Sequence, residues 1–210
     1  MIIGVLALQG AFAEHEHKLV KLGVQTRQIR TTNDLEGIHG LILPGGESTS
    51  MGILQDHSNL FQSIRDKLNT GLCVWGTCAG LILLADDVHG RVHGQPIIGG
   101  LHVQVQRNYF GSQQHSFVTD LPIQLSSSSD DVHNVKAVFI RAPVITRVLD
   151  TDKVKVLARL GEAHQHAIVA VQQGDRILGT AFHPELTPDD CLHRHFLRMV
   201  EHAVASRSQK

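Results

Sequence analysis

The sequence predicts an α/β fold with a mostly parallel central sheet and antiparallel additions. Two observations support this prediction. In the first third of the chain, short apolar runs alternate with longer amphipathic ones, which is the pattern of strands alternating with helices. In the remainder, strand-like runs follow one another with few helical patterns between them, which favours antiparallel pairing.

The first half of the chain contains two strand-to-turn-to-helix corners. Phe12, Leu19 and Leu22 lie among polar residues at roughly helical spacing, and Gly23 follows where a helix often ends. Two other apolar runs lead into glycine-rich turns, each of which opens a helix. We expect strands at residues 2–8, 24–29, 40–43 and 72–75, and helices at residues 12–22, from residue 47, and at residues 81–85.

The second half is expected to consist mainly of strands and to end in one helix. Gln173-Gly174-Asp175, between two apolar runs, is a hairpin-turn signal. Pro188 suits the first turn of a helix that continues to Ala205. The expected strands are residues 102–106, 114–118, 123–125, 137–140, 154–160, 168–172 and 176–182. The length suits one core, so we interpret residues 1–205 as a single domain and residues 206–210 as a polar C-terminal tail.

Composition and charge disfavour several classes of protein. Of the 210 residues, 42% are hydrophobic and 19% charged, the formal net charge is -1, and neither half is strongly basic, which disfavours a nucleic-acid partner. The apolar run at residues 1–8 is far shorter than the ~20 residues of a membrane span, so no membrane association is expected. Cys73, Cys78 and Cys191 form no disulfide pattern, so we expect a cytoplasmic protein.

Histidine is frequent in this chain, which contains 15 of them. Some stand in pairs two residues apart: His15 and His17, His164 and His166, and His193 and His195. On a strand such a pair shares a face, but none has cysteines or carboxylates nearby at the spacing of a zinc site. We therefore interpret these histidines as solvated side chains and expect no metal and no cofactor.

The segment Gly76-Thr77-Cys78-Ala79-Gly80 has the glycine spacing of a nucleophile elbow, with cysteine in the position of the usual serine. A sharp strand-to-helix turn needs glycines where the backbone is crowded, and it places the sulfur at the positive end of the next helix, which favours the thiolate. The backbone N–H of Ala79 can then donate to an oxyanion, with the Gly45-Gly46 turn as the best second donor. The alternative is a small, buried, unreactive cysteine.

A thiolate nucleophile needs a base and a group that orients the base, and His183-Pro184-Glu185 offers both directly after an apolar strand. On an extended segment, side chains two residues apart share a face. Glu185 would then accept from one imidazole nitrogen while the other faces the sulfur. The alternative is a solvated histidine at a strand end. A nucleophile, a base and a carboxylate in this order favour catalysis.

Gly76–Gly80 together with His183-Pro184-Glu185 resembles the class I, triad-type glutamine amidotransferase family. Further segments resemble one subfamily, the glutaminase subunits of pyridoxal 5′-phosphate synthase. These segments are Leu8-Gln9-Gly10, Pro44-Gly45-Gly46-Glu47-Ser48-Thr49, Arg107-Asn108-Tyr109-Phe110-Gly111, Phe139-Ile140-Arg141-Ala142-Pro143 and Phe182-His183-Pro184-Glu185-Leu186-Thr187. The resemblance runs from residue 2 to about residue 200 and implies a three-layer, flavodoxin-like fold.

The resemblance also implies roles for individual residues. Cys78 would be the nucleophile, His183 the base and Glu185 its orienting carboxylate, with the oxyanion held at Gly46 and Ala79. L-glutamine would be bound by Gly46, Glu47, Ser48, Arg107, Ile140 and Arg141. Guanidinium groups suit the carboxylate of glutamine and Glu47 suits its ammonium. From the residues alone, a helix-capping Glu47 and solvated arginines stay open as alternatives.

The implied function is hydrolysis of L-glutamine to L-glutamate and ammonia through a glutamyl thioester. The ammonia would pass to a separate synthase subunit that makes pyridoxal 5′-phosphate, in vitamin B6 biosynthesis, within a large hetero-oligomer. Three alternatives remain. The chain could be the glutaminase of another amidotransferase, such as that of histidine biosynthesis. It could instead be a catalytically silent binding module on the same fold, or a cysteine hydrolase of esters or lactones. The chain departs from the family pattern at Ser112, where a basic residue is expected, and in the long polar segment at residues 126–134.

Overall fold

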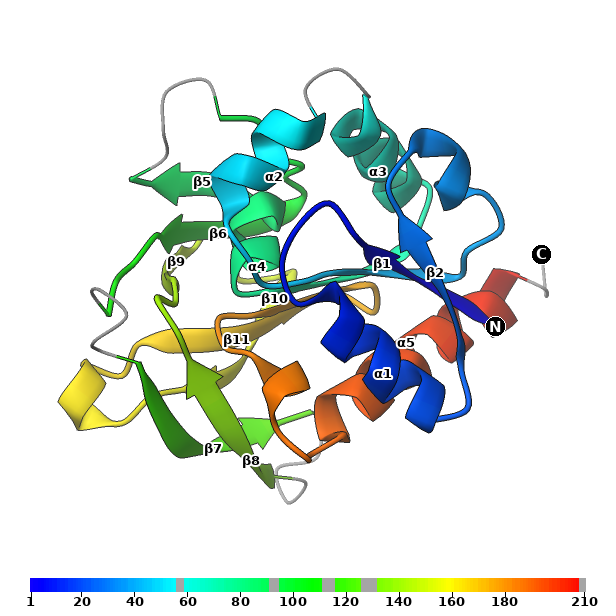
Figure 1. Cartoon of the computed structure of the whole chain (residues 1–210). Coiled ribbons are helices and arrows are strands. Elements are labelled where there is room, and N and C mark those ends of the chain that lie inside the picture. The colour runs from blue at the N-terminus through cyan, green and yellow to red at the C-terminus, as the bar shows by residue number, and fades with distance from the viewer. Residues whose placement is uncertain (56–58, 91–94, 111–115, 126–131, 208–210) are drawn as a thin grey trace.

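The protein is organised around one ten-stranded mixed sheet with a separate two-stranded sheet beside it (Figure 1). The computed structural model describes residues 1–55, 59–90, 95–110, 116–125 and 132–207, without the side chains of residues 52–55. The large sheet has the order β2-β1-β3-β4-β12-β11-β9-β6-β5, and β10 pairs with β11 outside this path. Its strands are β1 (Ile2–Leu6), β2 (Gln25–Ile29), β3 (Gly40–Leu43), β4 (Cys73–Thr77), β5 (Ala85–His89), β6 (Leu101–Gln106), β9 (Val144–Val148), β10 (Val154–Arg159), β11 (Ile168–Gln173) and β12 (Ile177–Thr180).

The strands of the first part of the chain form the parallel half of the sheet. Parallel pairs join β2 to β1, β1 to β3, β3 to β4 and β4 to β12. Antiparallel pairs join β11 to β12, β9 and β10, and β6 to β9, whereas β5 is parallel to β6. The predicted α/β fold with a mostly parallel central sheet and antiparallel additions is confirmed.

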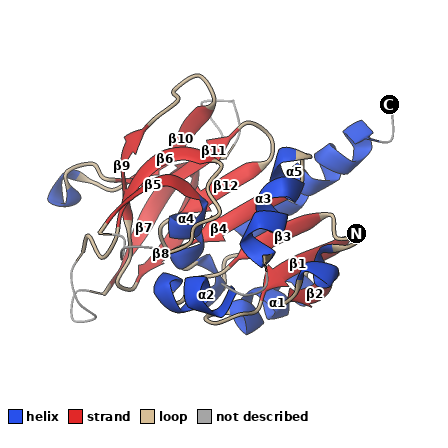
Figure 2. Cartoon of the chain, turned by 90° about the horizontal axis from the view of Figure 1, so that it is seen from above, coloured by secondary structure: helices blue, strands red, loops and turns tan. Residues whose placement is uncertain are grey.

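Helices cover both faces of the sheet and complete three layers (Figures 1 and 2). On β4, the side chain of Trp75 packs against Phe196 with ring centroids 5.7 Å apart, while the next residue, Gly76, faces Gly80 on the opposite side. Because successive residues of a strand point to opposite faces, these contacts place α5 and α4 in different layers. The helices are α1 (Phe12–Lys21), α2 (Ser48–Gln55), α3 (Leu60–Asn69), α4 (Ala79–Leu84) and α5 (Cys191–Arg207), with short 3-10 turns η1 (Thr32–Leu35), η3 (Glu162–His164) and η4 (Pro184–Leu186).

The two-stranded sheet differs from expectation. We expected separate strands at residues 114–118 and 123–125, but a single strand, β7 (Phe117–Gln124), continues through Pro122 and pairs with β8 (Val132–Phe139). Each strand of a two-stranded sheet has a free edge, where the missing N–H of a proline breaks no ladder. Residues 114 and 115 lie outside the described residues, as do Ser112 and residues 126–131 of the polar segment.

Three elements were not predicted: α3, β5 and β9. The first turn of α3 buries Leu60, Phe61 and Ile64, an amphipathic pattern that the sequence reading overlooked. The last helix begins at Cys191 and not at Pro188. The side chain of Asp189, in the turn before the helix, accepts the Cys191 backbone N–H at 2.7 Å and so satisfies one donor of the first helical turn. It ends at Arg207, so the first two residues of the expected polar tail are helical.

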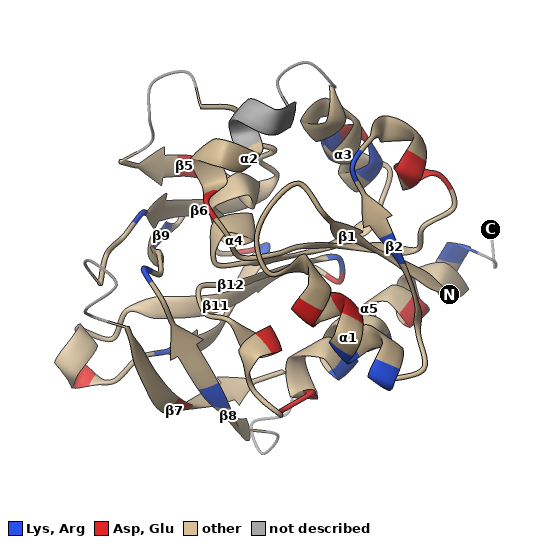
Figure 3. Ribbon diagram, in the orientation of Figure 1, with Lys and Arg blue, Asp and Glu red and all other residues tan. Residues whose placement is uncertain are grey.

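Acidic and basic residues are interspersed on the surface helices α1 and α5 (Figure 3). This distribution agrees with the formal net charge of -1. In the described part of the chain, no helix is long and apolar enough to cross a membrane.

Candidate active site

Cys78 lies at the sharp turn between β4 and α4. Its backbone has φ 47° and ψ -102°, a positive φ that non-glycine residues rarely adopt outside strained functional turns. Its N–H donates to the carbonyl of Thr180 at 2.8 Å. A Cβ on Gly76 would lie 2.5 Å from the Gly80 carbonyl oxygen, and a Cβ on Gly80 would lie 1.9 Å from that of Leu43. The glycines are therefore required by crowding, as the elbow interpretation predicted.

The sheet topology brings His183 to Cys78. β12 pairs with β4 in parallel, with Thr180 opposite Thr77, so both strands end at the same edge. His183 follows β12, and its side chain and that of Cys78 meet beside Gly45 and line the same pocket. His183 Nδ1 lies 2.7 Å from Glu185 Oε1, and both side chains are buried. The sequence reasoning predicted this contact.

The extended backbone predicted for this contact is wrong. His183 and Glu185 do not lie on an extended segment, because Pro184–Leu186 forms the 3-10 turn η4, for which His183 is the N-terminal flanking residue. The tight turn brings the Glu185 carboxylate back to the His183 imidazole. Proline suits this position because its fixed φ matches the first residue of a turn.

The electrostatics of the pair favour a charged imidazolium. Burial alone lowers the pKa of His183, but hydrogen bonds and charge interactions with Cys78 and Glu185 outweigh burial and raise the pKa to about 10. At neutral pH His183 therefore carries a proton beside the Cys78 sulfur. This arrangement places a proton donor next to the candidate nucleophile.

All of the predicted site residues except Glu185 line one pocket of about 260 Å³. It is bordered by Cys78 and His183 on one side and by the Gly45-Gly46 turn on another. A Cβ on Gly45 would lie 2.3 Å from His183 Cε1, so only glycine allows this approach. Glu185 lies behind His183 and does not line the pocket. The lining residues are Gln9, Gly46, Glu47, Ser48, Cys78, Ala79, Ile82, Arg107, Asn108, Ile140, Arg141 and His183.

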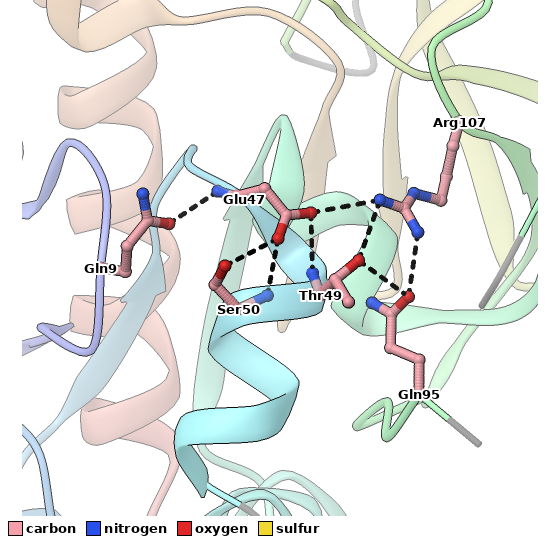
Figure 4. A network of polar contacts seen from close by, with 6 residues as sticks. All are labelled: Gln9, Glu47, Thr49, Ser50, Gln95 and Arg107. Atoms are coloured by element: carbon pink, nitrogen blue, oxygen red, sulfur yellow. Dashed lines mark hydrogen bonds and ion pairs between the residues drawn. The ribbon is translucent and has the colours of Figure 1, made fainter. Parts of the chain in front are cut away.

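Glu47 both caps α2 and pairs with Arg107 (Figure 4). Its carboxylate accepts the backbone N–H groups of Thr49 at 3.0 Å and Ser50 at 2.7 Å, and it lies 3.3 Å from Arg107 Nη2. Burial raises the pKa of Glu47, but the hydrogen bonds from Thr49 and Ser50 lower it to about 2. The helix-capping alternative is therefore seen in the structure, together with an ion pair that sequence reasoning did not anticipate.

Two glutamines that the sequence reading did not assign complete this network. Gln9 Oε1 accepts the backbone N–H of Glu47 at 2.7 Å, and Gln95 Oε1 accepts from Arg107 Nη1 at 2.9 Å (Figure 4). Gln9 was noted only for its place in the family pattern, and nothing in the sequence around Gln95 indicated a role. Arg107 is thus held by several acceptors, whereas Arg141 is exposed at the pocket with φ 48°.

The interpretation of the paired histidines as solvated is wrong for three of them. His15 on α1 and His193 on α5 are fully buried, and His195 is also buried. Burial lowers the pKa of His15 well below its usual range, and burial with the nearby charge of Lys18 lowers that of His193 to about 3. Helical periodicity, which places both pairs on helices facing the sheet, is the signal that the sequence reading missed.

These buried neutral histidines predict a loss of stability in acid. The unfolded chain takes up protons on His15 and His193 below about pH 6.5, while the folded protein does not until near pH 3 for His193. The free energy of unfolding should therefore fall as pH decreases through this window, by up to roughly 1.4 kcal/mol per pH unit for each histidine. Urea unfolding at several pH values measures this slope, and His193→Gln should flatten it. A slope unchanged by the substitution would contradict the assignment.

Comparisons with known proteins agree with the family resemblance found in the sequence. Residues 5–202 match the SNO glutamine amidotransferase family. A protein of Desulforamulus reducens named pyridoxal 5′-phosphate synthase subunit PdxT is 49% identical over 96% of this chain and 100% of its own length. An Arabidopsis thaliana protein named probable pyridoxal 5′-phosphate synthase subunit PDX2 is 42% identical over 100% of this chain and 91% of its own. A crystal structure of a glutamine amidotransferase has a TM-score of 0.84 at 42% identity, covering 96% of this chain and 100% of that one.

Proposed function

The chain belongs to the SNO glutamine amidotransferase family, and on that premise we propose that it is the glutaminase subunit of a pyridoxal 5′-phosphate synthase. It hydrolyses L-glutamine to L-glutamate and ammonia and supplies the ammonia to a synthase subunit for vitamin B6 biosynthesis. The observation that carries this proposal is the constellation of Cys78, His183 and Glu185 at the edge of a pocket bordered by Gly46 and Arg141.

In the first half of the reaction, the Cys78 thiolate attacks the side-chain amide carbon of glutamine. The C–S bond forms as the carbonyl electrons move to oxygen, and the backbone N–H groups of Gly46 and Ala79 stabilise this oxyanion. When the oxyanion collapses, the C–N bond breaks. His183 gives its proton to the departing nitrogen, so that ammonia leaves and a glutamyl thioester remains on Cys78.

In the second half, water hydrolyses the thioester. His183, now neutral, removes a proton from water as the water oxygen attacks the thioester carbon, and the same two N–H groups hold the second oxyanion. Collapse breaks the C–S bond and regenerates the thiolate beside imidazolium. The new carboxylic acid gives its proton to solvent and leaves as glutamate. Glu185 keeps the ring in the correct orientation through the 2.7 Å contact with Nδ1 throughout.

The charged groups of the pocket suit the two charges of free glutamine. Arg141 and the Ser48 hydroxyl, which is buried and makes no hydrogen bond to the described residues, are placed to bind the α-carboxylate. Glu47 is placed for the α-ammonium, and Arg107, which lines the same pocket, pairs with the Glu47 carboxylate at 3.3 Å. Ile140 adds to the wall of the pocket.

Replacement of Arg141 by methionine should raise the KM for glutamine by about 10-fold to 100-fold, because a hydrogen bond to a charged group contributes about 1.5–3 kcal/mol. The kcat should change by less than about threefold, since the interaction is the same in ground and transition states. Steady-state kinetics in the presence of the synthase measure both constants. Arg147→Met, on the exposed side of β9, is the matched control. An Arg141→Met enzyme with an unchanged KM would remove Arg141 from the substrate site.

The chemistry of ammonia implies that the protein that uses it is docked on this chain. Ammonia is largely protonated at neutral pH and in that form is no nucleophile, so release into solvent would waste it. The relatives are named as subunits of pyridoxal 5′-phosphate synthase, which supports a synthase subunit as the protein partner. A large hetero-oligomer stays a prediction.

The test is glutamate release from glutamine by the wild-type chain with and without a purified pyridoxal 5′-phosphate synthase subunit. We expect hydrolysis that the synthase stimulates. Hydrolysis stimulated only by a different synthase would support another amidotransferase, such as that of histidine biosynthesis. A protein inert with every partner would support a silent binding module and overturn the proposal.

A further inference from the structure

A buried histidine that the reaction scheme does not use lies directly behind the proposed triad. His15 on α1 is fully buried, and its Nε2 atom lies 3.4 Å from Glu185 Oε2 and 3.3 Å from Thr77 Oγ1. Its other nitrogen, Nδ1, lies 3.0 Å from His193 Nε2 on α5. The ring also packs edge-on against Trp75 of β4, with centroids 5.6 Å apart. Contacts from three other parts of the chain, β4, the segment at η4 and α5, therefore fix its position.

The two oxygens of Glu185 have different surroundings. Oε1 receives the hydrogen bond from His183, whereas Oε2 is buried and has no hydrogen-bond partner among the described residues. His15 Nε2 is the polar atom that faces it, at an ion-pair distance longer than that of a strong hydrogen bond. A buried carboxylate oxygen without a donor is unfavourable, and catalytic hydrogen bonds often shorten when substrate binds.

The neighbours of His15 select one tautomer. If Nδ1 carried the proton, the lone pair of Nε2 would face the Glu185 carboxylate, which is repulsive. With the proton on Nε2, His15 donates toward Glu185 and Thr77, and Nδ1 accepts from His193 Nε2–H. His193 Nδ1 then keeps a lone pair, and it is the one ring nitrogen of the two histidines that has no partner in the described structure.

Burial and the cationic or titratable groups His193, His183 and Lys18 favour the neutral form of His15 and outweigh the nearby Glu185 carboxylate. Lys18 lies one turn along α1, His193 faces it from α5, and His183 and Glu185 approach from the segment at η4. Lys18 itself is paired with Asp190 at 2.9 Å, next to the start of α5. His15 therefore acts as a neutral donor and leaves the negative charge on Glu185.

We propose that His15 is a positioning residue, which holds the second carboxylate oxygen of Glu185 and thereby fixes His183 against Cys78, with His193 setting the tautomer of His15. The proposal deepens the glutaminase function and rests on it. The proposal adds two buried side chains to the series Cys78, His183, Glu185: His15 on α1 and His193 on α5. These helices lie on the face of the sheet opposite α4 (Figure 1).

The test compares His15→Phe and His15→Gln with wild type in the complete complex with the synthase. Phenylalanine keeps a ring but has no donor, so kcat should fall about tenfold, equivalent to about 1.4 kcal/mol, with KM within about twofold. The alkaline limb of the pH profile of kcat/KM should move to lower pH, because a loosened Glu185 holds the His183 proton less firmly. Glutamine restores an N–H donor at similar reach and should recover most of kcat.

His195→Phe is the matched control, because His195 is a second buried histidine of α5 that bonds to Gln172 and not to the triad. It should lower stability while leaving kcat and the pH profile unchanged. If His15→Phe shows no cooperative unfolding transition, His15→Asn replaces it, since its amide is one methylene too short to reach Glu185. The His15→Asn variant should then have a lower kcat than the His15→Gln variant.

A second measurement, alkylation of Cys78 by iodoacetamide as a function of pH, separates this proposal from the glutaminase proposal. In the donor-free variants, the pH dependence of alkylation should differ from wild type even if the wild-type complex releases no glutamate. Wild-type glutamate release and alkylation profiles in His15→Phe would overturn the positioning role. Equal loss of kcat in the Phe and Gln variants with wild-type pH profiles would also overturn it, by showing a purely structural role.

Discussion

Replacement of Cys78 by alanine is expected to lower glutamine hydrolysis by at least about 10⁴-fold, because no other group in the pocket can form the thioester. The fold should persist, since alanine fits the space of cysteine at the turn. The positive φ of 47° is present with either residue, so the strain of the elbow is unchanged. Binding of glutamine should remain, because the proposed ligands Arg141 and Glu47 are intact.

Glutamate release in the presence of the synthase measures the first effect, and calorimetric titration with glutamine measures the second. Cys191→Ala is the control, since Cys191 begins α5 and does not line the pocket. If the Cys78→Ala enzyme retained more than about one per cent of the wild-type rate, covalent catalysis at this residue would be refuted.

Replacement of Glu185 by glutamine should lower kcat by roughly 10³-fold to 10⁴-fold, the scale seen when the carboxylate of a Ser-His-Asp triad becomes an amide. The carboxylate accepts from His183 Nδ1 at 2.7 Å and contributes to the raised pKa of that ring. An amide bears no charge and can present its N–H₂ to Nδ1, which selects the wrong tautomer. KM should change little, since Glu185 does not line the pocket.

The substitution should also change the pH dependence of stability in a defined direction. The pKa of His183 is raised from 6.5 to about 10, so its stabilising contribution is complete below about pH 6.5 and is lost as pH rises through about 10. The difference in free energy of unfolding between wild type and Glu185→Gln should therefore shrink over this interval. Glu162→Gln in the exposed turn η3 serves as control. A Glu185→Gln enzyme with wild-type kcat would exclude Glu185 from the mechanism.

The elbow and the class of fold were predictable because they depend on local chemistry. Glycines at Gly76 and Gly80 and an apolar run before them specify the turn, and its crowding can be inferred without coordinates. The parallel pairing of β4 with β12 then brings His183 to Cys78. The alternation of apolar and amphipathic runs was sufficient to predict the class of fold.

Interactions across the fold were not predictable. His15 and His193 are far apart in the sequence, and only the packing of α1 and α5 on the same face brings them within 3.0 Å. Gln95 is likewise placed by a loop, and no pattern links it to Arg107. Glu185 illustrates the same limit, since it lies on a tight turn, a detail that depends on a few backbone angles.

The most direct test of the account is covalent labelling of the complex with a chloroketone analogue of glutamine, in which a thiolate displaces chloride and forms a stable thioether. Peptide mass spectrometry locates the adduct. We predict one adduct, at Cys78, that excess glutamine suppresses. Cys73 should not react, because it is buried and burial raises the pKa of its thiol to about 11. An unlabelled Cys78, or labelling that glutamine does not suppress, would contradict a glutamine site built around Cys78, His183 and Glu185.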